Sequence, residues 1–164
     1  MASFRTNYPT PLERQFTRFY NHECHQYAHL HKNKSVTMIG LSPDHPAVSA
    51  GIVRVEFSKS ASANEALGKR KRGALGLRTD TIVCHIETKT GETLRIDAQV
   101  NIDLVEINSR LETQPELVSM DPEGAGFLCV GLTRTETDMD KCFPGFVLGG
   151  NVSTFKKLYV DSVV

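Results

Sequence analysis

The sequence lacks a net charge and lacks any long apolar run. Its 164 residues hold 19 lysines and arginines against 19 aspartates and glutamates, so the whole molecule has no bulk attraction to nucleic acid or to a membrane surface. No stretch approaches the roughly 18 apolar residues of a membrane span. Apolar residues nevertheless make up 40% of the chain, which is ordinary for a globular protein with a core. These features predict one domain over residues 1–164 that binds no membrane.

Paired cysteines are also missing. The four cysteines form no CxxC pair, and we expect no secretory signal before them. Reduced thiols in the cytosol or nucleus fit this usage best. Cys84 and Cys129 lie inside apolar runs, so we expect them to fill the core rather than to react.

The sequence offers no nucleophile elbow, no paired metal motif and no phosphate-binding loop. The stretch NHECHQYAHLHKNK suggests a metal site, because Cys24, His25, His29 and His31 are of the residue types that bind zinc. No second ligand pair follows, and we favour a solvated loop that leads into a strand. His45 precedes a proline and is expected in a turn. We therefore assign no catalytic, cofactor-binding or metal-ligating residue.

The charges are unevenly distributed along the chain. Residues 54–78 hold seven cations and two acids, or +5, whereas residues 103–140 hold nine acids and two arginines, or −7. Lys69, Arg70, Lys71 and Arg72 form an uninterrupted cationic run. Neighbouring like charges repel by about 1 kcal/mol at roughly 4 Å in water, so this run must stay exposed. We take it as the candidate partner-binding site; a loop without a partner, a nuclear import signal and a contact with nucleic-acid phosphate remain alternatives.

Short β-branched segments separated by turn residues predict a mainly β (α+β) fold, either a small barrel or a sandwich. In 81–87 and 92–98, apolar residues alternate with polar ones, and Gly91 suits the positive φ of a hairpin turn. Residues 59–72 are expected to form an exposed loop. The predicted strands are 35–41, 52–58, 81–87, 92–98, 100–107 and 126–132.

Helices are predicted at both ends of this core, which covers about residues 30–132. Leu12, Phe16, Phe19 and Tyr20 fall at i, i+4, i+7 and i+8, the stripe of a helix over about residues 10–21. We prefer this helix to a mitochondrial presequence and to an exposed aromatic anchor at residues 18–20. The tail at 133–164 is expected to hold a linker and a final helix.

The stretch VEINSRLETQPELVSMDPEGAGFL, residues 105–128, closely resembles the glycine-cleavage H protein. The resemblance implies a barrel-sandwich hybrid of the lipoyl type. Counted back from Asn108 without a gap, the lipoyl lysine of that family falls on Gly91, which has no amine to carry the cofactor. Lys89 lies two positions away and preserves strand parity, so a carrier subunit of a multienzyme complex is the alternative. The matching residues are Glu106, Asn108, Leu111, Pro115, Glu116, Leu117, Val118, Asp121, Pro122, Gly124 and Gly126.

A second resemblance covers more of the chain. The segments FTRFY at 16–20, DHP at 44–46, GKRKRGA at 68–74 and EIN at 106–108 occur in an order that resembles the Abitram (Simiate) family of actin-binding transcription modulators. This resemblance implies a non-enzymatic protein without a cofactor or small-molecule substrate. It implies binding to monomeric and filamentous actin, nuclear protein partners, and residence in nuclear speckles and cytoplasm. An RNA-linked nuclear adaptor is a further alternative, motivated by the cationic run.

Overall fold

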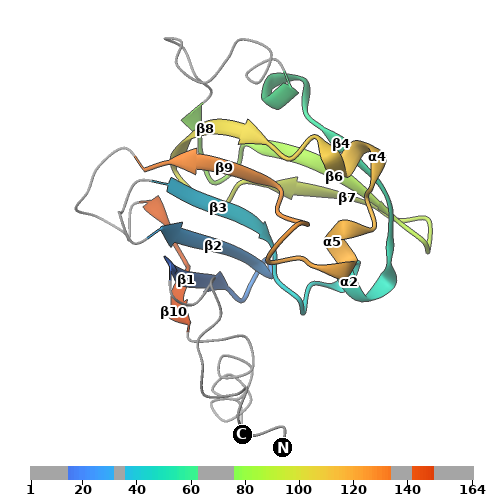
Figure 1. Ribbon diagram of the computed structural model, residues 1–164, viewed down its shortest axis with the longest axis horizontal. Coiled ribbons are helices and arrows are strands. Elements are labelled where there is room, and N and C mark those ends of the chain that lie inside the picture. The colour runs from blue at the N-terminus through green and yellow to red at the C-terminus, as the bar shows by residue number, and fades with distance from the viewer. Residues whose placement is uncertain (1–14, 32–35, 63–75, 134–141, 150–164) are drawn as a thin grey trace, which may run out of the picture.

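Two antiparallel sheets pack face to face in the computed structural model, which describes residues 15–31, 36–62, 76–133 and 142–149 (Figure 1). The larger sheet has seven strands in the order β10-β1-β2-β3-β9-β8-β5, and the smaller has three in the order β4-β6-β7. The predicted mainly β fold is therefore confirmed. Among the described strands, the two sheets remain separate and do not close into a barrel.

The larger sheet consists of β1 (Phe16–Asn21), β2 (Gln26–His31), β3 (Val36–Leu41), β5 (Gly76–Leu77), β8 (Ile102–Ile107), β9 (Cys129–Leu132) and β10 (Val147–Gly149). The smaller sheet consists of β4 (Ile52–Phe57), β6 (Ile82–Thr88) and β7 (Thr93–Asp97). Three short helices, α2 (Pro46–Ala50), α4 (Arg110–Thr113) and α5 (Leu117–Met120), lie between strands. No helix in the described part of the chain is long and apolar enough to cross a bilayer.

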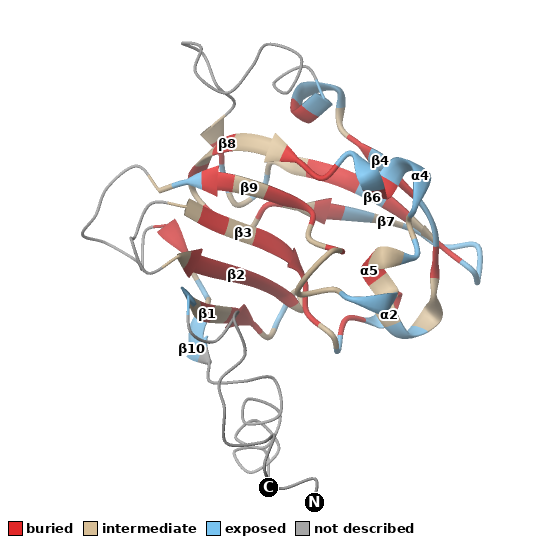
Figure 2. Cartoon of the chain, viewed as in Figure 1, coloured by how far each residue is buried: buried red, intermediate tan, exposed pale blue. Residues whose placement is uncertain are grey.

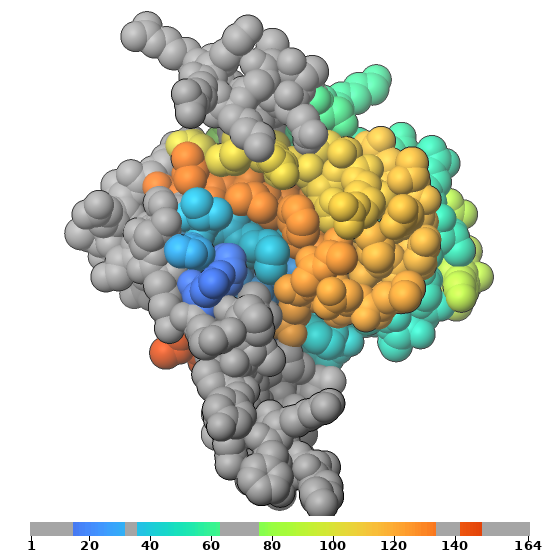
Figure 3. Space-filling view, in the orientation of Figure 1, coloured from blue at the N-terminus to red at the C-terminus, as the bar shows by residue number. Residues whose placement is uncertain are grey.

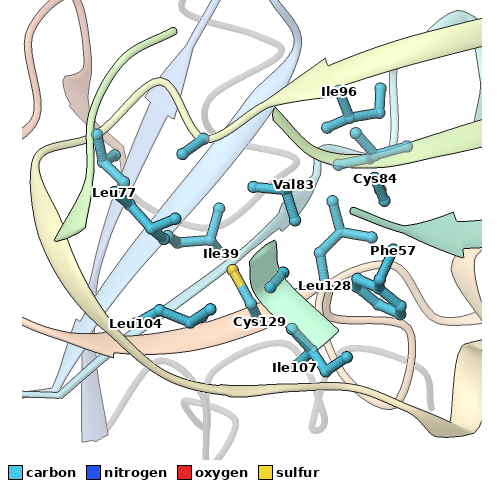
Figure 4. Packing of buried hydrophobic residues seen from close by; sticks show 14 of the residues in the cluster. Ile39, Phe57, Leu77, Val83, Cys84, Ile96, Leu104, Ile107, Leu128 and Cys129 are labelled. Atoms are coloured by element: carbon cyan, nitrogen blue, oxygen red, sulfur yellow. The ribbon is translucent and has the colours of Figure 1, made fainter. Parts of the chain in front are cut away.

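The core lies between the two sheets, where apolar side chains of both converge (Figure 4). Ile39 and Cys129 come from the larger sheet, and Phe57, Cys84 and Ile96 come from the smaller. Cys84 and Cys129 are free thiols that are fully buried, as predicted. Burial raises the pKa of Cys129 to about 12 and also raises that of Cys84, so both behave as small core hydrophobes.

Each of the six predicted ranges overlaps an observed strand, and β6 extends one residue beyond its predicted range. The predicted hairpin is the β6–β7 pair, in which Leu94 lies opposite Ile86 and Arg95 opposite His85. His85 is exposed, as its place in the alternation indicated. A register shift between Ile82 and Cys84 breaks the alternation, and Val83 and Cys84 are both buried as a result.

The predicted N-terminal helix is wrong over residues 16–21, which form strand β1. Phe19 packs toward the core and stacks on Phe143 at 5.3 Å between ring centroids. Tyr20 is buried on the opposite face of the sheet. When both faces of a strand are covered, the period of two disappears, and the spacing of Phe16, Phe19 and Tyr20 imitates a helix.

The solvated loop predicted ahead of the first strand is also wrong in part. Residues 26–31 form β2, which lies between β1 and β3 and is almost entirely buried (Figure 2). The exposed loop predicted at 59–72 begins instead with a helical turn at 59–62 that buries Ala61. The predicted C-terminal helix and the cationic run at 69–72 lie outside the described residues.

Candidate functional site

The tip of the β6–β7 hairpin is a three-residue loop, Lys89, Thr90 and Gly91. The Thr88 amide donates to the Glu92 carbonyl at 2.9 Å, and the Gly91 amide donates to the Thr88 carbonyl at 3.0 Å. Inside the turn, the hydroxyls of Thr88 and Thr90 are 2.7 Å apart. The loop residues and Glu92 are exposed, whereas Thr88 is buried. The tip is therefore an ordered turn at one end of the molecule (Figure 1).

Gly91 occupies the position of this turn that requires a positive φ, and its φ is 89°. Three-residue hairpin loops place a left-handed residue at this point, where a side chain costs roughly 1–2 kcal/mol. A Cβ on Gly91 would meet no atom within 4 Å, so backbone conformation, not space, favours glycine. Gly91, the residue matched to the lipoyl lysine, therefore presents only backbone atoms and no amine.

Lys89 contacts Gly51, which lies between α2 and β4. Its amide donates to the Gly51 carbonyl at 3.0 Å. A Cβ on Gly51 would lie 2.8 Å from Lys89 Cδ, so the lysine stem covers Gly51 at the end of α2. These contacts tie the hairpin tip to the α2–β4 junction and hold the tip in one orientation.

Residues 121–126, which we name the cap loop, follow α5. The Asp121 carbonyl accepts hydrogen bonds from the Gly124 amide at 3.1 Å and the Gly126 amide at 2.8 Å, and its Oδ2 accepts from the Ala125 amide at 3.0 Å. A Cβ on Gly126 would lie 2.3 Å from the Leu117 carbonyl oxygen, so only glycine fits there. The DPEGAG segment is therefore a compact loop fixed by its own hydrogen bonds.

Asn108 anchors the chain at the end of the cap loop. Its Nδ2 donates to the carbonyls of Ala125 and Phe127, both at 2.8 Å, and its own amide donates to the Leu128 carbonyl at 2.9 Å. The residue is buried. Asn108 therefore fixes the path of the chain between the cap loop and β9.

The cap loop lies on the outer face of the larger sheet, opposite the core. Strand pairing places Tyr20, Tyr27 and Gly40 in one row across β1, β2 and β3, with Arg18, His29 and Met38 in the next. The ring of Tyr27 lies across Gly40, where a Cβ would come within 2.5 Å of its hydroxyl oxygen. Figure 3 shows the orange surface around the cap loop adjoining the blue and cyan surface of these strands.

A single carboxylate joins this row of side chains to the cap loop. Glu123 Oε1 accepts hydrogen bonds from the Tyr20 hydroxyl and from His29 Nε2, the latter at 2.9 Å. Because a carboxylate only accepts, His29 carries its proton on Nε2. The Tyr27 hydroxyl donates to the Pro122 carbonyl at 2.5 Å. We name Tyr20, Tyr27, His29 and Glu123 the capped cluster.

Burial dominates the electrostatics of the capped cluster. It raises the pKa of Tyr20 and of Tyr27, and the Glu123 charge raises both further. Burial lowers the pKa of His29, although Glu123 and the Ala28 carbonyl favour the proton. Both tyrosines and the histidine are therefore neutral at pH 7, and Glu123 and Arg18 carry the charges beside them.

The residues of the zinc interpretation do not come together. His29 belongs to the capped cluster, His31 packs edge-on against the Phe16 ring, and His25 Nδ1 lies 3.4 Å from Asp44 Oδ2. Burial raises the pKa of Cys24 to about 11. Across the described ranges, no three histidine, cysteine, aspartate or glutamate side chains lie close enough to hold a metal ion.

His45 lies in a turn, as expected, and caps α2. Its Nδ1 accepts a hydrogen bond from the Ala47 amide at 3.0 Å. Burial, together with nearby His25, lowers the pKa of His45 to about 4. The neutral ring is the form that can accept this bond, so capping and burial require the same protonation state.

The capped cluster itself was not predicted from the sequence. The one local signal is that Tyr27 and His29 lie two positions apart in QYAHLH and therefore share one face of a strand. Glu123 comes from a loop 94 positions beyond His29, and no local pattern relates the two.

Comparison with known proteins identifies relatives along most of the chain. No family model matches it. Protein Abitram of Drosophila melanogaster is 32% identical over 138 residues, which cover 82% of this chain and 64% of that protein. Protein Abitram of Dictyostelium discoideum is 31% identical over 130 residues, or 74% of each chain. The chain thus spans less than two thirds of the fly relative's length.

Among solved structures, the glycine cleavage system H protein of Mycobacterium marinum superimposes with a TM-score of 0.58 at 15% identity. The match covers 88% of this chain and 97% of that one. It confirms the predicted H-protein-like fold and, at this identity, concerns the fold alone.

Proposed function

The chain belongs to the Abitram family, and from this premise we propose that it is a non-catalytic binding module that contacts monomeric and filamentous actin. The family resemblance supports an influence on filament growth and a link to transcription. It also supports residence in nuclear speckles and in the cytoplasm. The H-protein-like fold supplies a rigid framework for recognition, since a fold of this kind serves several unrelated functions.

The observation that carries the proposal is the hairpin tip. Gly91 has a φ of 89° and stands at the exposed end of the turn. A carrier of the lipoyl type needs a primary amine at that point to form an amide with the cofactor. Gly91 has no side-chain amine at this position. We therefore propose that the fold is used for recognition rather than for group transfer.

The contact surface we propose is the cationic run Lys69, Arg70, Lys71 and Arg72, which lies outside the described residues. Four adjacent positive charges suit an acidic protein surface, and complementary charge acts on both association rate and specificity. Because such contacts weaken with salt, we expect actin binding by this protein to fall between low and physiological ionic strength.

Cosedimentation with filamentous actin tests the proposal. Reversing Lys69, Arg70, Lys71 and Arg72 to glutamate should weaken binding by at least about tenfold, since several favourable charge contacts become repulsive. The matched control reverses four other cations, Lys59, Arg78, Lys89 and Arg110, all of them exposed, so that the net charge changes equally. If both quadruple variants remain folded and bind alike, the run is not the interface; if the unchanged protein does not bind actin, the proposal fails.

Two further measurements separate the alternatives. The intact mass of protein isolated from its native source should show no lipoyl adduct, and an adduct on Lys89 or any other lysine would replace the proposal with a carrier function. RNA binding that falls steeply with salt would favour the nuclear adaptor. Its absence at low salt, together with actin binding, would support the proposal as stated.

A further inference from the structure

The cap loop is fastened to the sheet by few bonds. Glu123 accepts from Tyr20 and from His29, and Pro122 accepts from Tyr27. Other hydrogen bonds of residues 124–126 join them to Asp121, to the Phe127 amide or to Asn108. The loop is therefore a preformed piece, and its attachment to β1 and β2 depends on the capped cluster.

His29 is enclosed in a way that suits only the neutral ring. Its side chain is 0% exposed, with the Tyr27 ring stacked at 4.1 Å and 16° and the Tyr20 ring edge-on at 5.5 Å. Its Nδ1 is buried and has no hydrogen-bond partner among the described residues. A proton on Nδ1 would place a charged ring in this enclosure, where Glu123 and the Ala28 carbonyl favour the proton but the loss of water costs more.

The charged groups beside His29 come from β1 and the cap loop, because β3 places Met38 next to it. Glu123 favours the imidazolium and Arg18 opposes it, while burial outweighs both and lowers the pKa of the ring. The titratable and charged groups facing the capped cluster are Arg18 and Tyr20 on β1, Tyr27 on β2, and Asp121 and Glu123 on the cap loop, while Cys129 on β9 acts on Tyr27 from the core side of the sheet.

We propose that His29 and Glu123 form an acid-sensitive latch, in which a proton on His29 Nδ1 releases the cap loop from the outer face of β1, β2 and β3. The closed state holds the neutral ring. The open state exposes Nδ1 to water, where the imidazolium is solvated. Opening uncovers the Tyr20 and Tyr27 rings, and so changes the surface that the sheet presents.

The direction and the size of the pH dependence follow from the different proton affinities of His29 in the open and closed states. A histidine exposed in the open state takes up its proton near pH 6.5, whereas the closed state resists it. The ratio of open to closed molecules therefore rises as the pH falls below about 6.5, by at most about tenfold per pH unit. Above pH 7 the latch is closed and insensitive to pH.

Hydrogen–deuterium exchange of the full chain between pH 7.5 and 5.5 tests the latch. After correction for intrinsic exchange, protection of the segment 121–127 should fall by about fivefold from pH 6.5 to 5.5, since the exposed histidine is already half protonated at pH 6.5. The β6–β7 hairpin should keep its protection, which distinguishes opening of the cap from global unfolding. Constant protection of the cap loop over this range would overturn the proposal.

Two variants identify the titrating group. His29→Phe keeps an aromatic ring between the tyrosines but binds no proton, so the pH dependence of cap exchange should disappear. His85→Gln removes an exposed histidine on β6 and should exchange as the unchanged protein does. If His29→Phe does not fold, the His29 ring signal of the unchanged protein serves instead. Its protonation should accompany cap opening, and a protonated ring under a protected cap would refute the latch.

Discussion

Asn108 provides the sharpest test of how the cap loop is held. Its Nδ2 donates two hydrogen bonds of 2.8 Å to the carbonyls of Ala125 and Phe127, and the residue is only 8% exposed. Asn108→Asp has the same shape but has no donor, and it directs a carboxylate at two carbonyl oxygens. Asn108→Ala removes the donor without adding charge.

The two variants should differ in magnitude. Leaving buried carbonyls without their donor costs about 1–3 kcal/mol, which is the loss expected for Asn108→Ala. An uncompensated buried charge costs about 3–5 kcal/mol at neutral pH, which is the loss expected for Asn108→Asp. Protonation of the new carboxyl restores one donor, so the Asn108→Asp penalty should shrink toward pH 4.

Asn21 supplies the matched control, because its side chain is used in the opposite sense. Its Oδ1 accepts from the amides of Glu23 at 2.9 Å and Cys24 at 3.3 Å, and it is 7% exposed. An aspartate accepts these bonds equally well, so Asn21→Asp should change stability by less than about 1 kcal/mol. Urea unfolding of the three variants decides the matter. Equal losses for Asn21→Asp and Asn108→Asp would refute the assignment of Asn108 as a required donor.

The remaining predictions concern two glycines and the cap of α2. Gly126→Ala places a Cβ against the Leu117 carbonyl and Val118 backbone and should cost about 3 kcal/mol in urea unfolding. Gly91→Ala meets open space and should lose only about 1 kcal/mol from its positive φ; a reversed order would contradict the two assignments. His45, with a pKa lowered to about 4, should make the protein lose up to about 2 kcal/mol between pH 6.5 and 5, because only the unfolded chain gains that proton. His45→Asn keeps an N-cap acceptor and should remove this part of the pH dependence, whereas an unchanged slope would show that another group causes it.

Much of the fold was predictable because its signals are local. Residues 81–98 alternate along two strands around a glycine, and the structure contains that hairpin with Gly91 at a φ of 89°. The segment 105–128 contains the family pattern, and its Asn108, Asp121 and Gly126 make contacts within some twenty residues of one another. A pattern predicts structure well when the interactions that select its residues lie within the pattern itself.

By itself the sequence determined the mainly β fold, the hairpin with a glycine at the position matched to the lipoyl lysine, and the family to which the chain belongs. Only the tertiary structure decided that residues 16–21 are a strand and that Tyr20, Tyr27, His29 and Glu123 meet. The physical reason is that β1 and β2 are buried on both faces, by the core on one side and by the cap loop on the other. Burial on both sides removes the alternation that marks a strand, and the covering loop lies too far along the chain for any local pattern to reveal it.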